Sequence, residues 1–242
     1  MMVRICIDIG HGGSDPGASY KGRKEKDDNL KLGLAVSKEL RRHGILVDET
    51  RTTDITLSLE ERSNFENKKK YDFFISFHRN AFKPEQANGV ETFTYINQTL
   101  KAKNLAHKIQ KALVGVGFTD RGVKKANFHV LRETKAPAIL IEVGFLDNTK
   151  DNQLFDSKFD EIVKGISKAV LDEIGIKYEE YSQPEILYRV MAGSYSNKEN
   201  AERQVERLKK AGFDAVIMPY KAWLLSINKW YIDYQIDRRE GF

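Results

Sequence analysis

Hydrophobic positions fall into short apolar runs that alternate with amphipathic stretches over the first three-quarters of the chain. Runs of strand length, rich in β-branched and aromatic residues, occupy residues 3–9, 45–50, 71–78, 89–96 and 136–146. Apolar residues at helical spacing predict helices over residues 30–42, 57–69, 100–113 and 159–174. A further short strand is expected at residues 127–132. Strands that alternate with helices in this way indicate an α/β domain.

The pattern changes after residue 176. The short polar segment 177–184 predicts a linker, which divides the chain into an N-terminal domain of residues 1–176 and a C-terminal domain of residues 185–242. The second domain begins with a predicted β-α-β unit and is therefore expected to be small and α+β. Its strands are expected at 186–193 and 215–219 and its helix at 197–211, and the aromatic-rich residues 220–242 predict strand and turn.

Composition and charge exclude several classes of protein. The 242 residues carry a net charge of +5, and this basic excess is too small and too scattered to predict a nucleic-acid partner. Cys6 is the only cysteine, which excludes an intrachain disulfide and a cysteine-based zinc cluster. No apolar stretch approaches the roughly 20 residues of a membrane span, so no membrane insertion is expected. The chain enters its first strand almost at once, which leaves no room for a signal peptide and predicts synthesis in the cytoplasm.

The candidate functional residues lie in, or shortly after, the predicted strands. His11 follows the first strand in a glycine-rich turn, His78 ends the strand 71–78, and Glu142 lies inside the most apolar strand, 136–146. A carboxylate within such an apolar run is costly unless it is paired or functional. Glu25 lies in the polar loop that follows the first turn. The carboxyl ends of strands in an open α/β sheet are where ligands bind, so these side chains are candidates for one site.

Two histidines and one carboxylate around an open position form a common catalytic zinc set. A second carboxylate nearby would serve hydrolysis by taking a proton from water and passing it to the leaving nitrogen. Sequence order alone does not reveal which of Glu25 and Glu142 would bind the metal and which would act as the base. The alternative is that Glu25 is a solvated loop acid and that both histidines are turn residues.

Five blocks of sequence resemble the zinc-dependent N-acetylmuramoyl-L-alanine amidases of the amidase-3 family. In chain order they are IGHGGSDPG at 9–17, Glu25-Lys with Asn29-Leu30, FISFHRNA at 74–81, GVE at 89–91, and PAILIEVGFL at 137–146. All occur in the order typical of the family, and together the resemblance covers about residues 1 to 175. It implies a twisted, mostly parallel sheet flanked by helices. It further implies one zinc ion held by His11, Glu25 and His78, and Glu142 as the catalytic carboxylate. The reaction implied is cleavage of the amide between N-acetylmuramic acid and the L-alanine of the peptidoglycan stem peptide.

Three further residues are candidates for substrate binding. Glu91, on the strand after the His78 loop, is expected in the cleft, and the alternative is an ordinary exposed strand acid. Arg79 departs from the resemblance, because the family often has a small residue after this histidine. It would either contact acidic groups of the substrate or point to solvent, and we favour solvent. His129 could line a cleft, but alternation alone does not decide this.

The C-terminal region resembles the first half of a SPOR domain, a class that binds peptidoglycan glycan strands stripped of stem peptides. The similarity runs through YRVMAGSYSNKENAE at 188–202 and LKKAGFDAV at 208–216 and then stops. Residues 220–242 are too short for the usual second half. The domain is then truncated, completed by a second chain in a dimer, or rebuilt with aromatic residues that include Trp223 and Trp230.

These observations together predict a two-domain hydrolase of the cell wall whose partner is peptidoglycan. A phage endolysin, made in the host cytoplasm and let through the membrane at lysis, fits the expected lack of a signal peptide. An autolysin released when a mother cell lyses is the second interpretation. Two other classes stay open: a zinc carboxypeptidase or other peptidase on a similar scaffold, and a non-catalytic peptidoglycan-binding protein.

Overall fold

The computed structural model describes residues 2–180 and 192–219. The chain divides into two compact units, Met1–Tyr181 and Ser182–Phe242, so the division falls inside the predicted linker 177–184. The first residues of that segment pack on the first unit, because Tyr178 contacts its core and Glu180 pairs with Lys164 and Lys168. The first unit therefore extends a few residues beyond 176.

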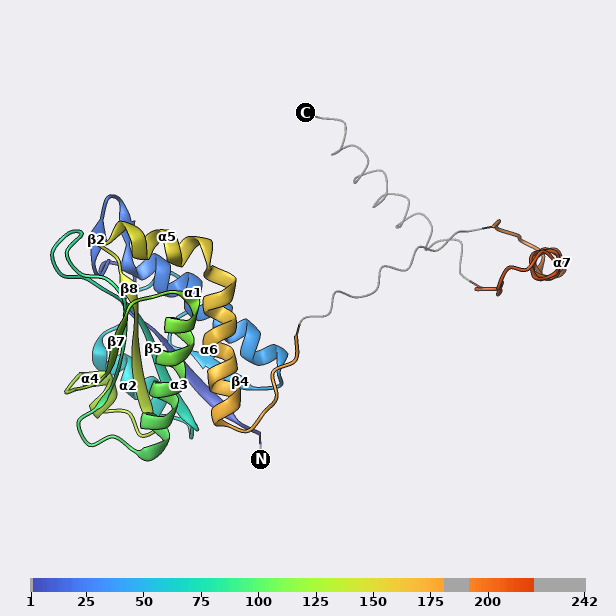
Figure 1. The fold of residues 1–242 in the computed structure, drawn as a ribbon. Coiled ribbons are helices and arrows are strands. Elements are labelled where there is room, and N and C mark those ends of the chain that lie inside the picture. Colours follow the sequence, from blue (N-terminus) through green and yellow to red (C-terminus); the bar gives the residue numbers. More distant parts are fainter. Residues whose placement is uncertain (1, 181–191, 220–242) are drawn as a thin grey trace. The chain divides into compact units, whose positions relative to one another are not determined.

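A six-stranded sheet with the order β4-β1-β5-β8-β6-β7 forms the centre of the first unit (Figure 1). Strand β5 pairs in parallel with β1 and β8, β1 pairs in parallel with β4, and β6 with β7; only the β6–β8 pair of this sheet is antiparallel. The expected mostly parallel sheet flanked by helices is confirmed. The strands are β1 (Arg4–Ile9), β4 (Leu46–Glu49), β5 (Phe73–Asn80), β6 (Val90–Tyr95), β7 (Asp120–Ala126) and β8 (Ala138–Phe145); a small hairpin comprises β2 (Ser19–Tyr20) and β3 (Arg23–Lys24).

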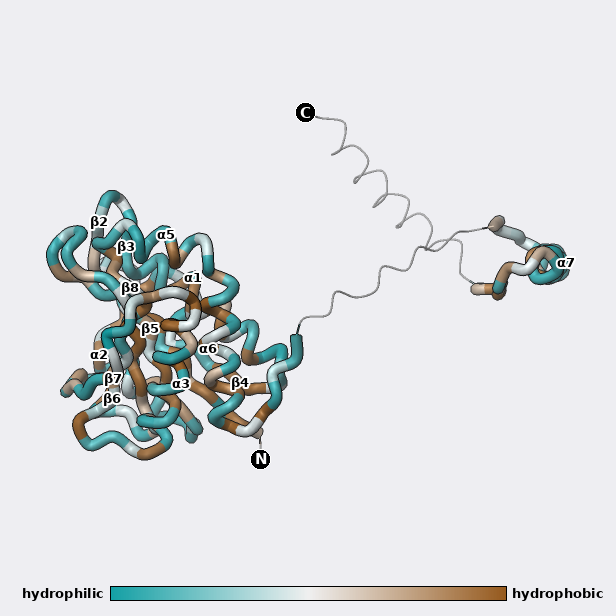
Figure 2. Tube along the Cα trace, in the orientation of Figure 1, coloured by the Kyte–Doolittle hydropathy of each residue, from teal (hydrophilic) through white to brown (hydrophobic). Residues whose placement is uncertain are grey.

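Helices cover both faces of the sheet. Successive residues of a strand point to opposite faces, and both sets are apolar in these strands, so each face needs a covering layer. Ile5 and Ile7 of β1 belong to a large cluster with α1 (Glu25–Arg42), α3 (Leu100–Val116) and α6 (Phe159–Glu173). Cys6 belongs to a smaller cluster with α2 (Leu59–Asn67) and α4 (His129–Arg132). Figure 2 shows the hydrophobic strands enclosed by more polar helices. The remaining helix of the first unit is α5 (Thr149–Ser157).

In the first unit one predicted strand and one predicted helix start are wrong, and β7 and α5 were not predicted. The strand expected at 127–132 is the helix α4, because the neighbouring residues Val130 and Leu131 pack into the same cluster, whereas a strand would point them to opposite faces. Strand β7 precedes α4 as a polar edge strand, and it lacks the alternation of apolar residues from which a strand is predicted. Helix α1 begins at Glu25 and not at Leu30, since Glu25, Asp27 and Asp28 fill a first turn that favours acids.

The second unit contains α7 (Lys198–Lys210), which confirms the helix expected at 197–211. The side chain of Asn197 caps it by accepting a hydrogen bond from the Glu199 amide at 2.7 Å. No strand is assigned to residues 215–219, where one was expected. The expected strand at 186–193 lies mostly outside the described residues, and 220–242 lies entirely outside them. Among the described helices, none combines the length and apolar character required to cross a membrane.

Candidate active site

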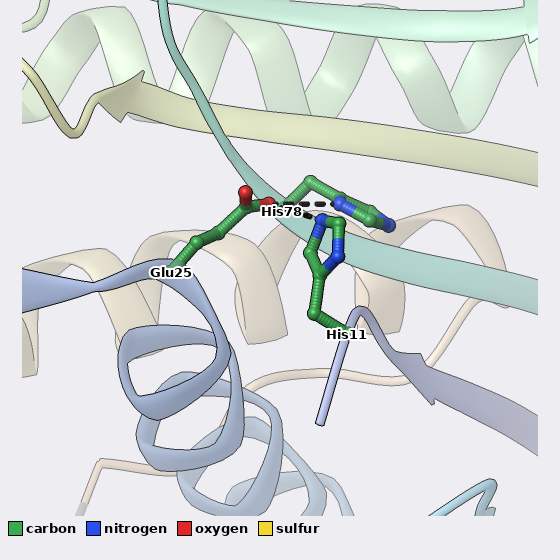
Figure 3. Close-up of side chains that lie close together, drawn as sticks. All are labelled: His11, Glu25 and His78. Carbon is green, nitrogen blue, oxygen red and sulfur yellow. Dashed lines mark hydrogen bonds and ion pairs between the residues drawn. The ribbon is translucent and has the colours of Figure 1, made fainter. Parts of the chain in front are cut away.

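Three of the predicted residues meet at one end of the sheet (Figure 3). His11 follows β1, Glu25 is the first residue of α1, and His78 lies near the end of β5. Glu25 Oε1 lies 2.9 Å from His78 Nδ1 and 3.2 Å from His11 Nε2. One donor atom from each of the three side chains lies within 4.8 Å of the others. The two imidazole rings meet edge to face, with centroids 4.9 Å apart.

The backbone of His11 is held in an unusual conformation. Its φ is +58°, a left-handed value that non-glycine residues seldom adopt. Its carbonyl accepts a hydrogen bond from Arg62 Nη2 at 2.8 Å, and Arg62 also binds the buried carboxylate of Asp8 at 2.9 Å. The imidazole Nδ1 lies 2.8 Å from Asp15 Oδ2, which leaves Nε2 to face Glu25. A carboxylate on the far nitrogen is the usual support of a metal-binding histidine.

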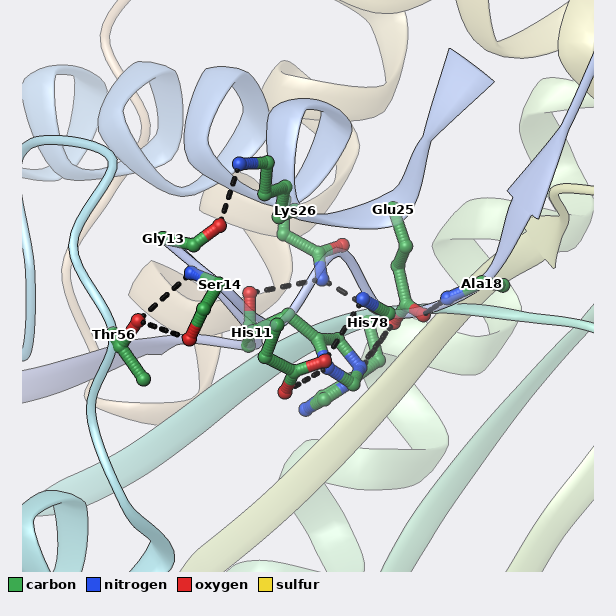
Figure 4. Close-up of polar contacts among 12 residues, drawn as sticks. His11, Gly13, Ser14, Ala18, Glu25, Lys26, Thr56 and His78 are labelled. Carbon is green, nitrogen blue, oxygen red and sulfur yellow. Dashed lines mark hydrogen bonds and ion pairs between the residues drawn. The ribbon is translucent and has the colours of Figure 1, made fainter. Parts of the chain in front are cut away.

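The turn that carries His11 is tied to its neighbours along its length. Lys26 Nζ donates to the carbonyl of Gly13, and the Ser14 amide donates to Thr56 Oγ1, both at 2.8 Å (Figure 4). Arg51 is buried and donates to the carbonyls of Ile9 and Gly10 at 3.0 Å. The turn is thereby fixed before any ligand binds.

Glu25 is buried and bound as a carboxylate. Its Oε2 accepts a hydrogen bond from the Ala18 amide at 2.9 Å, and its Oε1 accepts one from the Arg79 amide at 3.0 Å. Burial alone would raise the pKa of Glu25, but hydrogen bonds and charge from His11 and His78 outweigh it and hold that pKa well below the usual range. Burial likewise opposes protonation of both histidines, yet contact with Glu25 raises the pKa of His78, and contacts with Glu25 and Asp15 raise the pKa of His11 to about 9.

Glu142 lies beside this cluster on β8, directly opposite His78 in the β5–β8 register. Its Oε2 is buried and has no hydrogen-bond partner among the described residues. Burial, together with the nearby charges of Glu25 and Glu91, raises the pKa of Glu142 to about 7 against the opposing effect of His78. An unpartnered carboxyl with a pKa near neutrality is suited to proton transfer.

The donor set fits a zinc ion. Two imidazole nitrogens and one carboxylate oxygen are ligands that zinc accepts, and bonds of about 2.0–2.1 Å place tetrahedral ligand atoms about 3.3 Å apart. The distances of 2.9 and 3.2 Å from Glu25 Oε1 to the two histidines are close to that spacing. The nearby Oε2 of Glu142, which lacks a partner, is free to interact with water or substrate.

The three candidate substrate residues have different surroundings. Glu91 is the register partner of Glu142 on the antiparallel strand β6 and is buried in contact with Asn80, Arg121 and Lys124. It is therefore not an exposed strand acid. His129 begins α4 and its Nε2 lies 3.2 Å from Ser63 Oγ on α2. The structure does not bring His129 into contact with the His11–Glu25–His78 cluster.

The favoured expectation that Arg79 points to solvent is wrong. Arg79 is 2% exposed, and its guanidinium donates to Asp28 at 2.5 Å and to Asn152 Oδ1 at 2.8 Å. It also lies over the ring of Phe155, 4.3 Å from the centroid. Side chains alternate along a strand, so Arg79 points to the opposite face from His78 and joins β5 to α1 and α5.

Two supporting residues were not predicted from the sequence. Asp15 orients His11 and lies four residues after it in the same turn, a spacing that gave no periodic signal. Asp8 lies inside the apolar first strand and pairs with Arg62 below the turn. A carboxylate inside an apolar run is as costly at Asp8 as at Glu142, so the same argument predicts a paired or functional role for Asp8.

Comparisons with known proteins agree with this fold. A family model for N-acetylmuramoyl-L-alanine amidase matches residues 5–172, and a SPOR domain model matches residues 169–232. The chain is 36% identical over 222 residues to the amidase CwlM of Bacillus licheniformis, a match that covers 90% of this chain and 85% of that protein. A sporulation-specific N-acetylmuramoyl-L-alanine amidase of Bacillus subtilis (strain 168) matches with the same identity and coverage. The crystal structure of an N-acetylmuramoyl-L-alanine amidase from Clostridium difficile 630 superposes with a TM-score of 0.69 at 37% identity, over 72% of this chain and 97% of that one.

Proposed function

Because the chain belongs to the N-acetylmuramoyl-L-alanine amidase family and is a peptidoglycan amidase, we propose that its reaction depends on zinc held by His11, Glu25 and His78, with Glu142 as the general base. The observation that carries the proposal is the convergence of the three donor side chains beside a carboxyl oxygen that has no partner. A bound zinc ion would polarise the amide carbonyl and make water more acidic.

The protein's own groups supply the proton transfers. Glu142 accepts a proton from the water whose oxygen adds to the carbonyl carbon of the lactyl group. It then donates this proton to the nitrogen of L-alanine as the carbon–nitrogen bond breaks, which leaves a carboxylic acid on the sugar and a free amine on the peptide. Burial raises the pKa of Glu142 above the ordinary value of 4.5, which brings acceptance and release of the proton closer to balance near neutral pH.

The fixed turn around His11 contributes by preorganisation. Asp15 orients the His11 imidazole, and Arg62 holds the His11 carbonyl. The amides of Ala18 and Arg79 hold Glu25 in place as a carboxylate, the form that binds a metal. Little reorganisation is then needed when the metal and the substrate bind.

The test is the release of L-alanine amino groups from purified peptidoglycan, with and without a strong chelator, by the intact protein and by Glu142→Gln. Release that stops with the chelator, returns with zinc and is lost in the variant supports the proposal. Release that persists in metal-free protein contradicts it. New carboxyl-terminal amino acids in place of new amines would instead support a carboxypeptidase. Binding without any cleavage would support a wall-binding protein.

For the C-terminal region we propose attachment to glycan strands that lack stem peptides. The SPOR match over residues 169–232 supports this, and a dimer through this region stays a prediction. The inactive full chain Glu142→Gln is expected to bind better to walls already stripped by an amidase than to intact walls. Equal binding to both would contradict the proposal. Sedimentation of the full chain measures its oligomeric state.

We propose two alternative settings in which the protein acts on the wall: phage lysis, as an endolysin, and lysis of a sporulating mother cell. The similarity to a sporulation-specific amidase over 90% of the chain supports the second setting. The time of synthesis separates them, because a sporulation enzyme is made as spores form and an endolysin only after phage induction.

A further inference from the structure

A cavity of about 590 Å³ lies beside the candidate active site and is lined by residues of β5, β6, β7 and β8. Asn80 follows His78 by two residues on β5, and Glu91 is the register partner of Glu142. The cavity therefore begins one strand away from the proposed base. Its lining includes Asn80, Phe82, Asn88, Glu91, Arg121 and Phe145.

The charges around this cavity favour an anionic group. Glu91 is 5% exposed and already accepts hydrogen bonds from Asn80 Nδ2 at 2.5 Å, from Arg121 Nε at 3.1 Å and from the Lys124 amine. Two cations thus share the Glu91 carboxylate, and the next carboxyl group, Glu142, lies on the neighbouring strand. Because Glu91 is shared, neither cation is paired with it one to one, and N–H groups of Arg121 remain for an anionic ligand.

Two contacts hold Arg121 in place and leave part of its guanidinium without a hydrogen bond within the described residues. Its guanidinium carbon lies 4.8 Å from the centroid of Phe145, and Nε is bound to Glu91. Nη1 makes one long contact of 3.4 Å to the carbonyl of Asn88, and Nη2 makes no hydrogen bond within the described residues. The side chain is 34% exposed. A planar guanidinium with free N–H groups is suited to a carboxylate.

We propose that this cavity binds the stem peptide beyond L-alanine, and that Arg121 recognises the free α-carboxylate of the second stem residue. The proposal rests on the amidase function above. The second residue is a glutamate joined through its γ-carboxyl group, so its α-carboxyl group is either free or amidated. Two extended residues span about 7 Å. The Arg121 guanidinium contacts Glu91 on β6, and β6 lies about 4.8 Å from the strand that carries Glu142. The α-carboxylate of the second stem residue therefore comes within reach of Arg121.

The experiment compares two soluble disaccharide-tetrapeptides that differ only at this group, one with D-glutamate and one with D-isoglutamine. The wild-type enzyme is expected to cleave the free acid with a kcat/KM about tenfold or more higher, since a charge-assisted pair is lost with the amide. Arg121→Gln is expected to lose most of this preference through a raised KM for the acid. Arg121→Lys keeps the positive charge but lacks the planar guanidinium, and it should retain an intermediate preference for the acid.

Lys125→Gln is the matched control, because it removes the same charge from an exposed position of the same strand outside the cavity. It should leave the preference unchanged. Equal cleavage of both substrates by the wild type, or an unchanged preference in Arg121→Gln, would overturn the recognition by Arg121 while the amidase function stands. Failure of the wild type to release amines from either substrate or from intact walls would instead refute the amidase function itself.

Discussion

His78 and Glu142 are register partners on the adjacent parallel strands β5 and β8. Strand partners lie about 4.8 Å apart, so this pairing places a candidate metal ligand and a candidate base side by side. On its other side Glu142 faces Glu91 on β6. The row of His78, Glu142 and Glu91 crosses three neighbouring strands and leads from the proposed zinc site into the cavity with Arg121.

Glu142 should set the acid limb of the pH–rate profile. A base works only when ionised, so activity is present above its pKa and is lost as the pH falls through it. Burial raises this pKa to about 7, and a nearby zinc ion would favour the charged form and move the limb lower, toward the ordinary value of 4.5. Glu142→Gln should reduce kcat by about 10²- to 10⁴-fold and remove the limb from the residual activity. Zinc content that equals that of the wild type is the control, and an unaltered acid limb in the variant would contradict the assignment.

Gly10→Ala should weaken metal binding specifically. A Cβ at this position would lie 2.3 Å from His78 Cε1, and this overlap would force the imidazole away from Glu25. The backbone of Gly10 does not require glycine, because its φ is not in the left-handed region, so the fold itself should persist. Zinc affinity, measured by competition with a chromophoric chelator, is expected to fall by tenfold or more.

The control is Gly115→Ala in helix α3. No atom lies within 4 Å of the Cβ that it adds, and alanine favours a helix over glycine by about 1 kcal/mol. This variant should keep its zinc affinity and gain stability. If Gly10→Ala binds zinc as well as Gly115→Ala does, the close packing of Gly10 on His78 has no role in the site.

Most of the sheet and the core of the site could be predicted from the sequence, because apolar runs and costly polar residues inside them carry local signals. Glu142 in β8 is such a residue. Strand β7 and helix α4 could not be predicted in this way, since an edge strand needs few apolar positions and a single helical turn has no period to detect. The contacts of Arg79 were also hidden, because they join residues 28 and 152, which are distant in sequence.

Zinc uptake should release protons at neutral pH. In the metal-free protein, contacts with Glu25 and Asp15 outweigh burial and raise the pKa of His11 to about 9, so His11 is protonated at pH 7 and must lose its proton to bind metal. Affinity should therefore rise with pH up to about 9 and level off above it. Calorimetry in two buffers with different ionisation enthalpies measures the protons released, which should number at least about one at pH 7 and fewer at pH 9.5. Equal release at both pH values would contradict protonation of His11.

The raised pKa of His11 has the opposite consequence for the stability of the metal-free fold. Its contribution is complete below the unfolded pKa of 6.5 and is lost as the pH rises through about 9. Zinc should stabilise the protein most in the upper part of this range, where the proton no longer competes. Thermal unfolding with and without zinc at pH 6 and pH 9 measures both effects together.

Arg79→Met should destabilise the fold without changing substrate recognition. Arg79 is buried against Asp28 and Asn152, and removal of one partner from a buried ion pair costs about 3–5 kcal/mol. Part of this cost should be offset, because Arg23 Nε also binds Asp28 at 2.6 Å. Denaturant unfolding should therefore show a loss near the lower end of that range. Arg132→Met is the matched control, since Arg132 forms an exposed pair with Glu133 and such pairs contribute at most about 1 kcal/mol. An Arg79→Met protein of normal stability with a raised KM would restore the substrate-contact interpretation, because a buried structural arginine cannot produce that combination.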